Sequence, residues 1–437
     1  MKHVYLALIA ILFIGTAAKA EVKIQHVTSP GGITAWLVEE HSIPFTALEI
    51  RFKGGASLDA KGKRGATSLM TYTLEEGAGD LNAREFAAKA EALAAHFSFD
   101  ISDDTLSVSA KFLSENQADA MDLLRLALQE PRFDPADIDR IRAQVISGLQ
   151  DDAKNPNSIS SSNFKKLAFG DHPYASSRNG TIESVKSLSR DDLIAAKAAV
   201  MARDRLFVGA VGDITPQELG KLLDDLLGGL PATGAKKPEQ AEFLLKGGVT
   251  VIPFDTPQSV VTFGAPGINQ DDDDFFAAYL MNTILGGSGR QSRLMEEVRE
   301  KRGLTYGIYT YFASRDFVDV FMGRVASANN RIAKTIEVIR DVWLDLAKNG
   351  VTPEELEGAK TYLTGAYPLR FDGNATIANI LVGMQLDGLP IDYIATRNDR
   401  LNAVTMQDID RVIKRLIRPE DLHFVVVGQP EGIKSTD

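Results

Sequence analysis

The 437-residue chain presents the same order of sequence signals twice, and this internal repeat restricts the folds that it can adopt. Residues 352–356 (TPEEL) begin a predicted helix as residues 134–138 (DPADI) do, with proline in the first turn. A predicted strand and a long helix precede each of them. Each half closes on a Val-containing strand that ends in glycine, at 207–212 and at 423–428. The repeat predicts an α+β fold with two homologous domains.

The limits of these domains follow from two segments. Residues 230–240 (LPATGAKKPEQ) have the proline, glycine and lysine content of a linker. Residues 1–20 have the three parts of an export signal, which are a positive start, a short apolar run and a small-x-small cleavage site at 18–20. We therefore expect a signal peptide at 1–20, an N-terminal domain at 21–229, the linker at 230–240 and a C-terminal domain at 241–437.

The composition limits the compartment and the partners. The apolar run of the signal is too short to span a bilayer, and the chain has no cysteine for a lipid anchor, a disulfide or thiol catalysis. We expect a periplasmic protein without a membrane anchor. Without Lys2 and Lys19, 46 of the 48 basic residues remain against 59 acidic ones, a net charge of −13. This charge disfavours nucleic acid and anionic lipid as partners.

The stretch from Leu285 to Tyr311 carries the main functional signal. Gly286, Gly287 and Gly289 surround Ser288 in a sharply turning segment. An amphipathic helix follows, with an apolar stripe of Leu294, Met295 and Val298 and a stop at Gly303. From Leu304 the apolar period changes to two, which predicts a strand. Arg299 then lies at the end of the helix and Tyr306 at the start of the strand.

The run REKRGLTY, which contains Arg299 and Tyr306 after a GGxxxxSRL approach, resembles the second domain of the pitrilysin and mitochondrial processing peptidase family of inverted zinc peptidases. The resemblance extends over essentially the whole mature chain. It implies two domains, each a mostly antiparallel sheet packed with helices. It also implies that Arg299 and Tyr306 bind the backbone of a peptide substrate and help to hold its tetrahedral intermediate, facing a zinc site on another domain or subunit.

The metal ligands of that family are missing from the first domain. Zinc-binding members carry an inverted H-x-x-E-H on the first long helix and a further glutamate on a later helix. Here Ser68 and Tyr72 stand in place of the two histidines, Thr71 in place of the glutamate, and Gly148 at or next to the third ligand. The sequence therefore predicts no metal site in this chain.

Inspection of the histidines and of the other candidate motifs supports this expectation. No two of the six histidines are three or four residues apart, so no helical histidine pair can form, although a zinc site assembled from dispersed histidines stays possible in principle. The four acids 271–274 lack the alternating ligands and the glycine of a calcium loop, and we interpret them as a solvated turn before a helix that begins at Phe275.

These observations predict a non-catalytic, substrate-binding subunit of a heterodimeric zinc metallopeptidase. Arg299 and Tyr306 act on peptide, while Gly286, Gly287, Ser288 and Gly289 contact or gate it. The zinc belongs to a homologous partner subunit with an intact H-x-x-E-H, and this chain alone is not expected to be catalytic. Two alternatives stay open. One is a stand-alone peptide-binding or assembly protein of the same fold, and the other is a self-sufficient hydrolase with unusual ligands.

Overall fold

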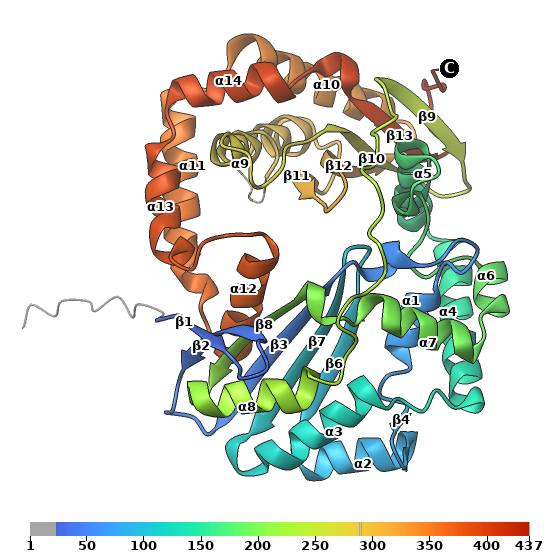
Figure 1. The fold of residues 1–437 in the computed structure, drawn as a ribbon. Coiled ribbons are helices and arrows are strands. Elements are labelled where there is room, and N and C mark those ends of the chain that lie inside the picture. The colour runs from blue at the N-terminus through green and yellow to red at the C-terminus, as the bar shows by residue number, and fades with distance from the viewer. Residues whose placement is uncertain (1–22, 288, 290, 437) are drawn as a thin grey trace, which may run out of the picture.

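The computed structural model describes residues 23–287, 289 and 291–436, and these form two halves, each built on one twisted sheet (Figure 1). The predicted signal peptide lies outside the described residues. The N-terminal sheet has the order β1-β2-β8-β3-β7-β6. Its strands are β1 (Gln25–Thr28), β2 (Thr34–Glu39), β3 (Phe45–Lys53), β6 (His96–Ile101), β7 (Thr105–Leu113) and β8 (Leu206–Gly212).

The C-terminal sheet has the order β11-β12-β10-β13-β9. Its strands are β9 (Gly248–Pro253), β10 (Gln258–Pro266), β11 (Ile308–Ser314), β12 (Asp319–Ala328) and β13 (His423–Gly428). From its hairpin edge, the N-terminal sheet runs β6-β7-β3-β8-β2, so the two sheets correspond strand for strand and β1 is an addition. All pairs are antiparallel except β2 with β8 and β9 with β13. The expected fold of two homologous α+β domains is confirmed.

One face of each sheet packs against helices of the same half, which enclose a separate apolar core in each half. The N-terminal half contributes α1 (Ala66–Tyr72), α2 (Ala83–Ala92), α3 (Gln117–Gln129), α4 (Pro135–Asp152), α5 (Pro156–Phe169), α6 (Ile182–Ser187), α7 (Arg190–Val200), α8 (Pro216–Leu227) and a short hairpin of β4 (Gly77–Ala78) and β5 (Leu81–Asn82). The C-terminal half contributes α9 (Phe275–Leu285), α10 (Ile332–Asn349), α11 (Pro353–Ala366), α12 (Asn374–Leu386), α13 (Tyr393–Ala403) and α14 (Met406–Leu416). In the part of the chain that the structure describes, no helix is both long and apolar enough to cross a membrane.

Two helices are exchanged between the halves. Helix α5 belongs to the N-terminal half but packs on β10 and β13 of the other sheet, while α12 packs on β3 and β8 (Figure 1). Glycines in the central strands make this close packing possible, because a Cβ at Gly264 of β10 would lie 2.8 Å from the ring of Phe164 in α5. A Cβ at Gly209 of β8 would lie 2.6 Å from the carbonyl oxygen of Ala378 in α12. Each half therefore supplies part of the cover of the other.

The segment between α8 and β9 contains no helix or strand. It nevertheless has fixed contacts, since the amide of Ala235 donates to the carbonyl of Ala199 at 2.9 Å and the amide of Ala241 donates to the carbonyl of Phe317 at 2.8 Å. The first of these contacts lies within the N-terminal half, and the second reaches the turn between β11 and β12. The predicted linker at 230–240 lies inside this segment.

Candidate functional site

The glycine segment after α9 is held tightly against strand β11. The amides of Gly286 and Gly287 both donate to the carbonyl of Asn282, at 2.9 and 2.7 Å, and the amide of Thr310 donates to the carbonyl of Gly286 at 2.7 Å. The Asn282 side chain completes the link, because it accepts from the Thr310 hydroxyl at 2.7 Å and donates to the Thr310 carbonyl at 3.3 Å. We refer to these contacts as the Asn282–Thr310 clamp.

The four residues predicted to contact the peptide differ in exposure. Gly286 and Gly287 are buried, and a Cβ at Gly286 would lie 2.5 Å from the Thr310 hydroxyl oxygen. Glycine at this position is therefore required by packing. Gly289 is exposed and has a φ of +133°, a conformation that favours glycine. Ser288 lies outside the described residues.

The helix after the glycine segment closes as a wide π-helical turn over Met295–Glu300, in which the amide of Lys301 donates to the carbonyl of Glu296 at 2.9 Å. The predicted apolar stripe is buried, with Leu294 and Val298 fully inaccessible. Gly303 ends the turn with a φ of +59°, as predicted. The apolar stripe thus faces the core and the charged residues face outward.

Arg299 differs from its neighbouring arginines in having few partners. Arg293 is bound by both carboxylate oxygens of Glu355, each at 2.7 Å, and by the carbonyl of Gly350 at 2.8 Å. Arg302 is bound by the carbonyl and the carboxylate of Glu297. Among the described residues, the ion-pair partner of the Arg299 guanidinium is the half-exposed carboxylate of Glu300, at 3.6 Å, and the Arg299 side chain is 32% exposed. Arg299 therefore retains donors for a ligand.

The predicted strand from Leu304 is wrong at its start, because β11 begins only at Ile308. Thr305 explains the difference: its hydroxyl donates to the carbonyl of Ala326 at 2.7 Å and of Gly307 at 2.9 Å, so a side chain takes the place of a backbone pair. Tyr306 lies in the bend that results and is 90% exposed. Arg299 and Tyr306 thus lie on the same connection, and no contact between their side chains is recorded.

The positions that would carry zinc in the first half are committed to structural hydrogen bonds. Ser68 is fully buried on α1 and donates to the carbonyl of Arg178 at 2.7 Å. Thr71 donates to the carbonyl of Thr67 at 2.8 Å, and the Tyr72 hydroxyl donates to Asn179 at 3.3 Å. At Gly148 on α4, an added Cβ would meet nothing within 4 Å. This donor set lacks the imidazole and carboxylate groups that zinc requires, so the site does not fit the metal.

The remaining polar groups named by the sequence have structural partners as well. His423 bonds the carbonyl of Lys246 at 2.7 Å, and His172 bonds the carbonyl of Glu239 at 3.2 Å. Asp272 and Asp274, in the turn before α9, pair with Arg415 and Arg411 of α14. Among the described residues, no group of three or more His, Cys, Asp or Glu side chains is arranged to hold a metal ion.

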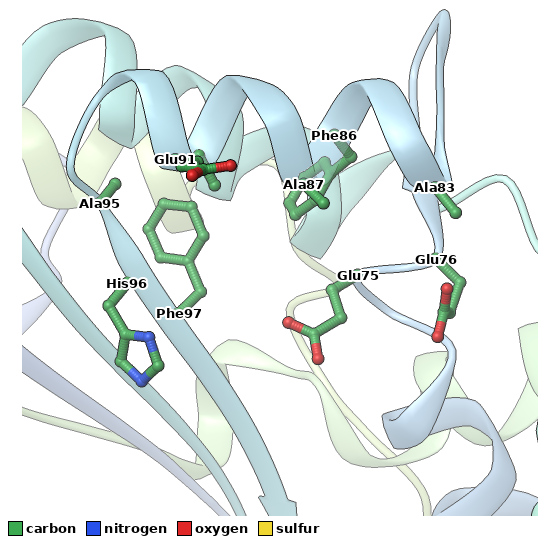
Figure 2. Close-up of a pocket in the computed structure, with 10 residues that line it drawn as sticks. Glu75, Glu76, Ala83, Phe86, Ala87, Glu91, Ala95, His96 and Phe97 are labelled. Carbon is green, nitrogen blue, oxygen red and sulfur yellow. The ribbon is translucent and has the colours of Figure 1, made fainter.

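An open pocket of about 510 Å³ lies between α2, the start of β6 and the residues that follow α1 (Figure 2). Phe86, Ala87 and Glu91 come from α2, while His96 and Phe97 come from β6 and Glu75 and Glu76 lie opposite. Burial and the charge of Glu76 raise the pKa of Glu75. The sequence did not predict this pocket, because it forms only where α2, β6 and the residues that follow α1 come together in the fold.

The β6 edge beside this pocket has free peptide groups. The amide of Ser102 donates to the carbonyl of Thr105, so this pair of the β6–β7 hairpin is a hydrogen-bonded one. Because such pairs alternate in an antiparallel ladder, the peptide groups of Phe97 and Phe99 point away from β7, toward the open edge. In the C-terminal half, Thr310 is the residue equivalent to Phe97. Its amide and carbonyl also point away from the neighbouring strand, but both are hydrogen-bonded within the Asn282–Thr310 clamp.

Two family models together match most of the chain. The model described as "Insulinase (Peptidase family M16)" matches residues 35–182, and the model described as "Peptidase M16 inactive domain" matches residues 187–363. The first matched range includes α1, where the metal ligands of the family are missing. The second includes the connection that carries Arg299 and Tyr306.

Individual relatives resemble the chain over nearly its whole length. A Helicobacter pylori protein named "Non-peptidase homolog YmxG" is 27% identical over 99% of this chain and 100% of its own length. The beta subunit of the mitochondrial-processing peptidase of Blastocladiella emersonii is 22% identical over 94% of this chain and 89% of its own. A crystal structure of a peptidase M16 inactive domain from Pseudomonas fluorescens has a TM-score of 0.88 at 28% identity, covering 95% of this chain and 100% of that one.

Proposed function

The chain belongs to peptidase family M16, the family of insulinase and pitrilysin, as a member of the non-catalytic type, and from this premise we propose that it is the substrate-binding subunit of a two-chain zinc metallopeptidase. The partner is a homologous subunit with an intact H-x-x-E-H, which carries the zinc and its chemistry. Both chains act in the periplasm, to which residues 1–20 direct this one.

The observation that carries the proposal is the exposure of Tyr306. A tyrosine side chain that is 90% exposed buries little apolar area, and among the described residues the Tyr306 side chain forms no hydrogen bond, so it contributes little to the stability of the fold. Arg299, on the same connection, has only a 3.6 Å contact to Glu300 among the described residues, whereas Arg293 is bound through several nitrogens and Arg302 through Nη1. Two free polar groups on a connection that is otherwise tightly bonded are what a peptide site requires.

The two side chains have different roles in the proposal. The Arg299 guanidinium donates to a carbonyl of the bound peptide, and because this charge-assisted bond exists in the ground state, it contributes to substrate binding. The Tyr306 hydroxyl donates to the carbonyl oxygen of the reacting peptide bond as negative charge develops there. A donor of this kind contributes mostly in the transition state, and removing one costs about 2.7–4 kcal/mol. Gly289 lies exposed nearby in sequence and contacts the peptide.

The test uses this chain purified together with a secreted H-x-x-E-H homologue from the same cell. Tyr306→Phe should lower turnover about a hundredfold or more, with a much smaller change in KM. Tyr309→Phe, three residues further on and 47% exposed, is the matched control and should leave turnover nearly unchanged. Arg299→Ala should harm both turnover and KM, and Arg302→Ala should harm neither. Near-full activity of the Tyr306→Phe pair, with complex formation intact, would refute the proposal.

The open β6 edge favours a second candidate, a stand-alone peptide-binding protein. The free peptide groups of Phe97 and Phe99 can accept an added strand, and Glu75 and Glu91 beside the pocket suit a basic side chain, whereas Glu76 is already paired with Arg140. The chain alone should then bind an extended lysine-containing peptide, and N-methylation of that peptide's backbone should abolish the binding. Equal binding of the methylated peptide would remove this candidate without affecting the first.

A further inference from the structure

Equivalent hairpin turns of the two halves meet near α5. The β6–β7 turn contains Asp103 and Asp104, and the β11–β12 turn contains Arg315 and Asp316. Arg315 lies 3.3 Å from the Asp103 carboxylate, across the boundary between the halves. Lys53, at the end of β3 in the N-terminal half, lies 3.2 Å from the carboxylate of Asp316 and also bridges the two halves. These turns form a polar contact between halves whose other shared contacts, at α5 and α12, are largely apolar.

The negative charge of Asp103 is compensated by neighbouring cations. It is 8% exposed and lies near three cations: Arg64 at 2.8 Å, Arg315 at 3.3 Å and Lys165 of α5 at 3.6 Å. Its charge is thus neutralised from both halves. Burial lowers the pKa of Lys165, and the charge of Asp103 opposes that effect.

Asp104 has no such compensation. Its carboxylate accepts a hydrogen bond from the buried Tyr174 hydroxyl, and no cation within ion-pair distance is recorded for it. The Arg315 guanidinium instead lies over the Tyr174 ring, 4.9 Å from its centroid. Asp316 is paired with Lys53 through Oδ1, but its Oδ2 atom is buried and has no hydrogen-bond partner among the described residues. The two carboxylates therefore lie at one boundary, and of the two only Asp316 has an ion-pair partner among the described residues.

We propose that the paired hairpin turns form a proton-dependent latch between the two halves, in which protonation of Asp104 favours the closed contact. This inference is independent of the peptidase proposal. The direction of the pH dependence follows from the surroundings of the Asp104 carboxyl group. Burial, with the negative charges of Asp316 and Asp103, raises the pKa of Asp104 from 3.8 to about 6, against the opposing effects of Tyr174 and Arg315. In an open state exposed to water the pKa returns toward its ordinary value, so the closed state gains stability as pH falls below about 6.

The other titratable groups at the contact have defined effects. The basic side chains at the contact are Lys53, Arg64, Lys165 and Arg315. Tyr174 stays protonated, since burial and Asp104 raise its pKa. His172 packs edge-on against Tyr174 with ring centroids 4.6 Å apart, and burial lowers the pKa of His172. Protonation of His172 would therefore oppose closure at low pH, and a His172→Gln background removes this opposing effect.

The experiment uses the full chain, whose lack of cysteine permits two unique spin labels, at Asp122→Cys in α3 and Lys348→Cys in α10. Electron–electron distance measurements report the populations of closed and open molecules. In the His172→Gln background the closed-to-open ratio should rise about tenfold from pH 7.5 to pH 5, and the rise should begin near the raised pKa of Asp104. Asp104→Asn should hold the closed distance at both pH values, and exposed Asp100→Asn should leave the response unchanged.

Asp316→Asn provides a second measurement that does not alter the titrating group. Removing its negative charge should lower the pKa of Asp104 and shift the midpoint of closure to lower pH. One distance distribution at both pH values, or a pH response that survives in Asp104→Asn, would overturn the proposal. If Asp104→Asn fails to fold, an unshifted midpoint in Asp316→Asn overturns it in the same way.

Discussion

The connection from α1 to β6 and the connection from α9 to β11 occupy equivalent places in the two halves, but they use their polar groups differently. In the first half, Ser68, Thr71 and Tyr72 satisfy neighbouring groups of the scaffold, while the β6 edge stays open beside a pocket. In the second half, the Asn282–Thr310 clamp closes the β11 edge, and Arg299 and Tyr306 stay free. Equivalent connections of one fold thus leave polar side chains exposed in one half and bond them to the scaffold in the other.

The sharpest contrast concerns zinc. Because the first half offers two hydroxyls, a phenol and a glycine where ligands belong, the purified chain should retain no stoichiometric zinc after gel filtration and should cleave no peptide alone. Elemental analysis checks the first expectation and a peptide-cleavage assay the second. About one tightly held zinc per chain, with activity that persists after removal of every partner, would contradict it.

Asn282→Ala should give the largest loss of stability in the second half. The change leaves the buried hydroxyl and carbonyl of Thr310 without a partner, at a cost of about 2–3 kcal/mol in the free energy of unfolding. Chemical denaturation measures it. The matched change in the first half, Asn179→Ala, removes only the 3.3 Å bond from Tyr72 and should cost less than about 1 kcal/mol. Equal losses in both halves would mean that the clamp has no special role.

Gly286→Ala tests whether the closed β11 edge depends on glycine. The new Cβ would lie 2.5 Å from the Thr310 hydroxyl oxygen and 2.8 Å from Leu294, and we expect a loss of about 1–3 kcal/mol by denaturation. Gly303→Asn is the control for a change of backbone conformation without a packing clash. The space around the Cβ position of Gly303 is open and asparagine tolerates its positive φ, so this change should cost little. An unchanged stability of Gly286→Ala would show that the segment adapts easily.

Gly148→Ala should give the smallest effect, and of opposite sign. An added Cβ on α4 meets nothing within 4 Å, so the helix should gain about 0.5–1 kcal/mol. Gly358, on the equivalent helix α11, is equally free and should respond in the same way. Thermal unfolding compares the two variants. A destabilised Gly148→Ala beside a stabilised Gly358→Ala would mean that the former ligand position still has a packing role.

The sequence predicted those features of the fold that local sequence signals determine. Helix α4 begins at Pro135, as predicted, because proline is favoured in the first turn. The strand predicted from Leu304 begins only at Ile308, because the start of β11 depends on the Thr305 hydroxyl bonding a carbonyl in β12. The latch joins Asp103 to Arg315, which are far apart in the chain. Such pairings depend on tertiary contacts that one sequence does not specify.

The exchange of α5 and α12 gives a reason why a copy without its own metal chemistry survives. If the first half were deleted, β10 and β13 would lose the cover of α5, and the site that bears Arg299 and Tyr306 would lose its support. If the second half were deleted, β3 and β8 would lose α12. After duplication, selection on either half therefore preserves both. Loss of catalytic residues is tolerated in such a chain, but loss of a domain is not.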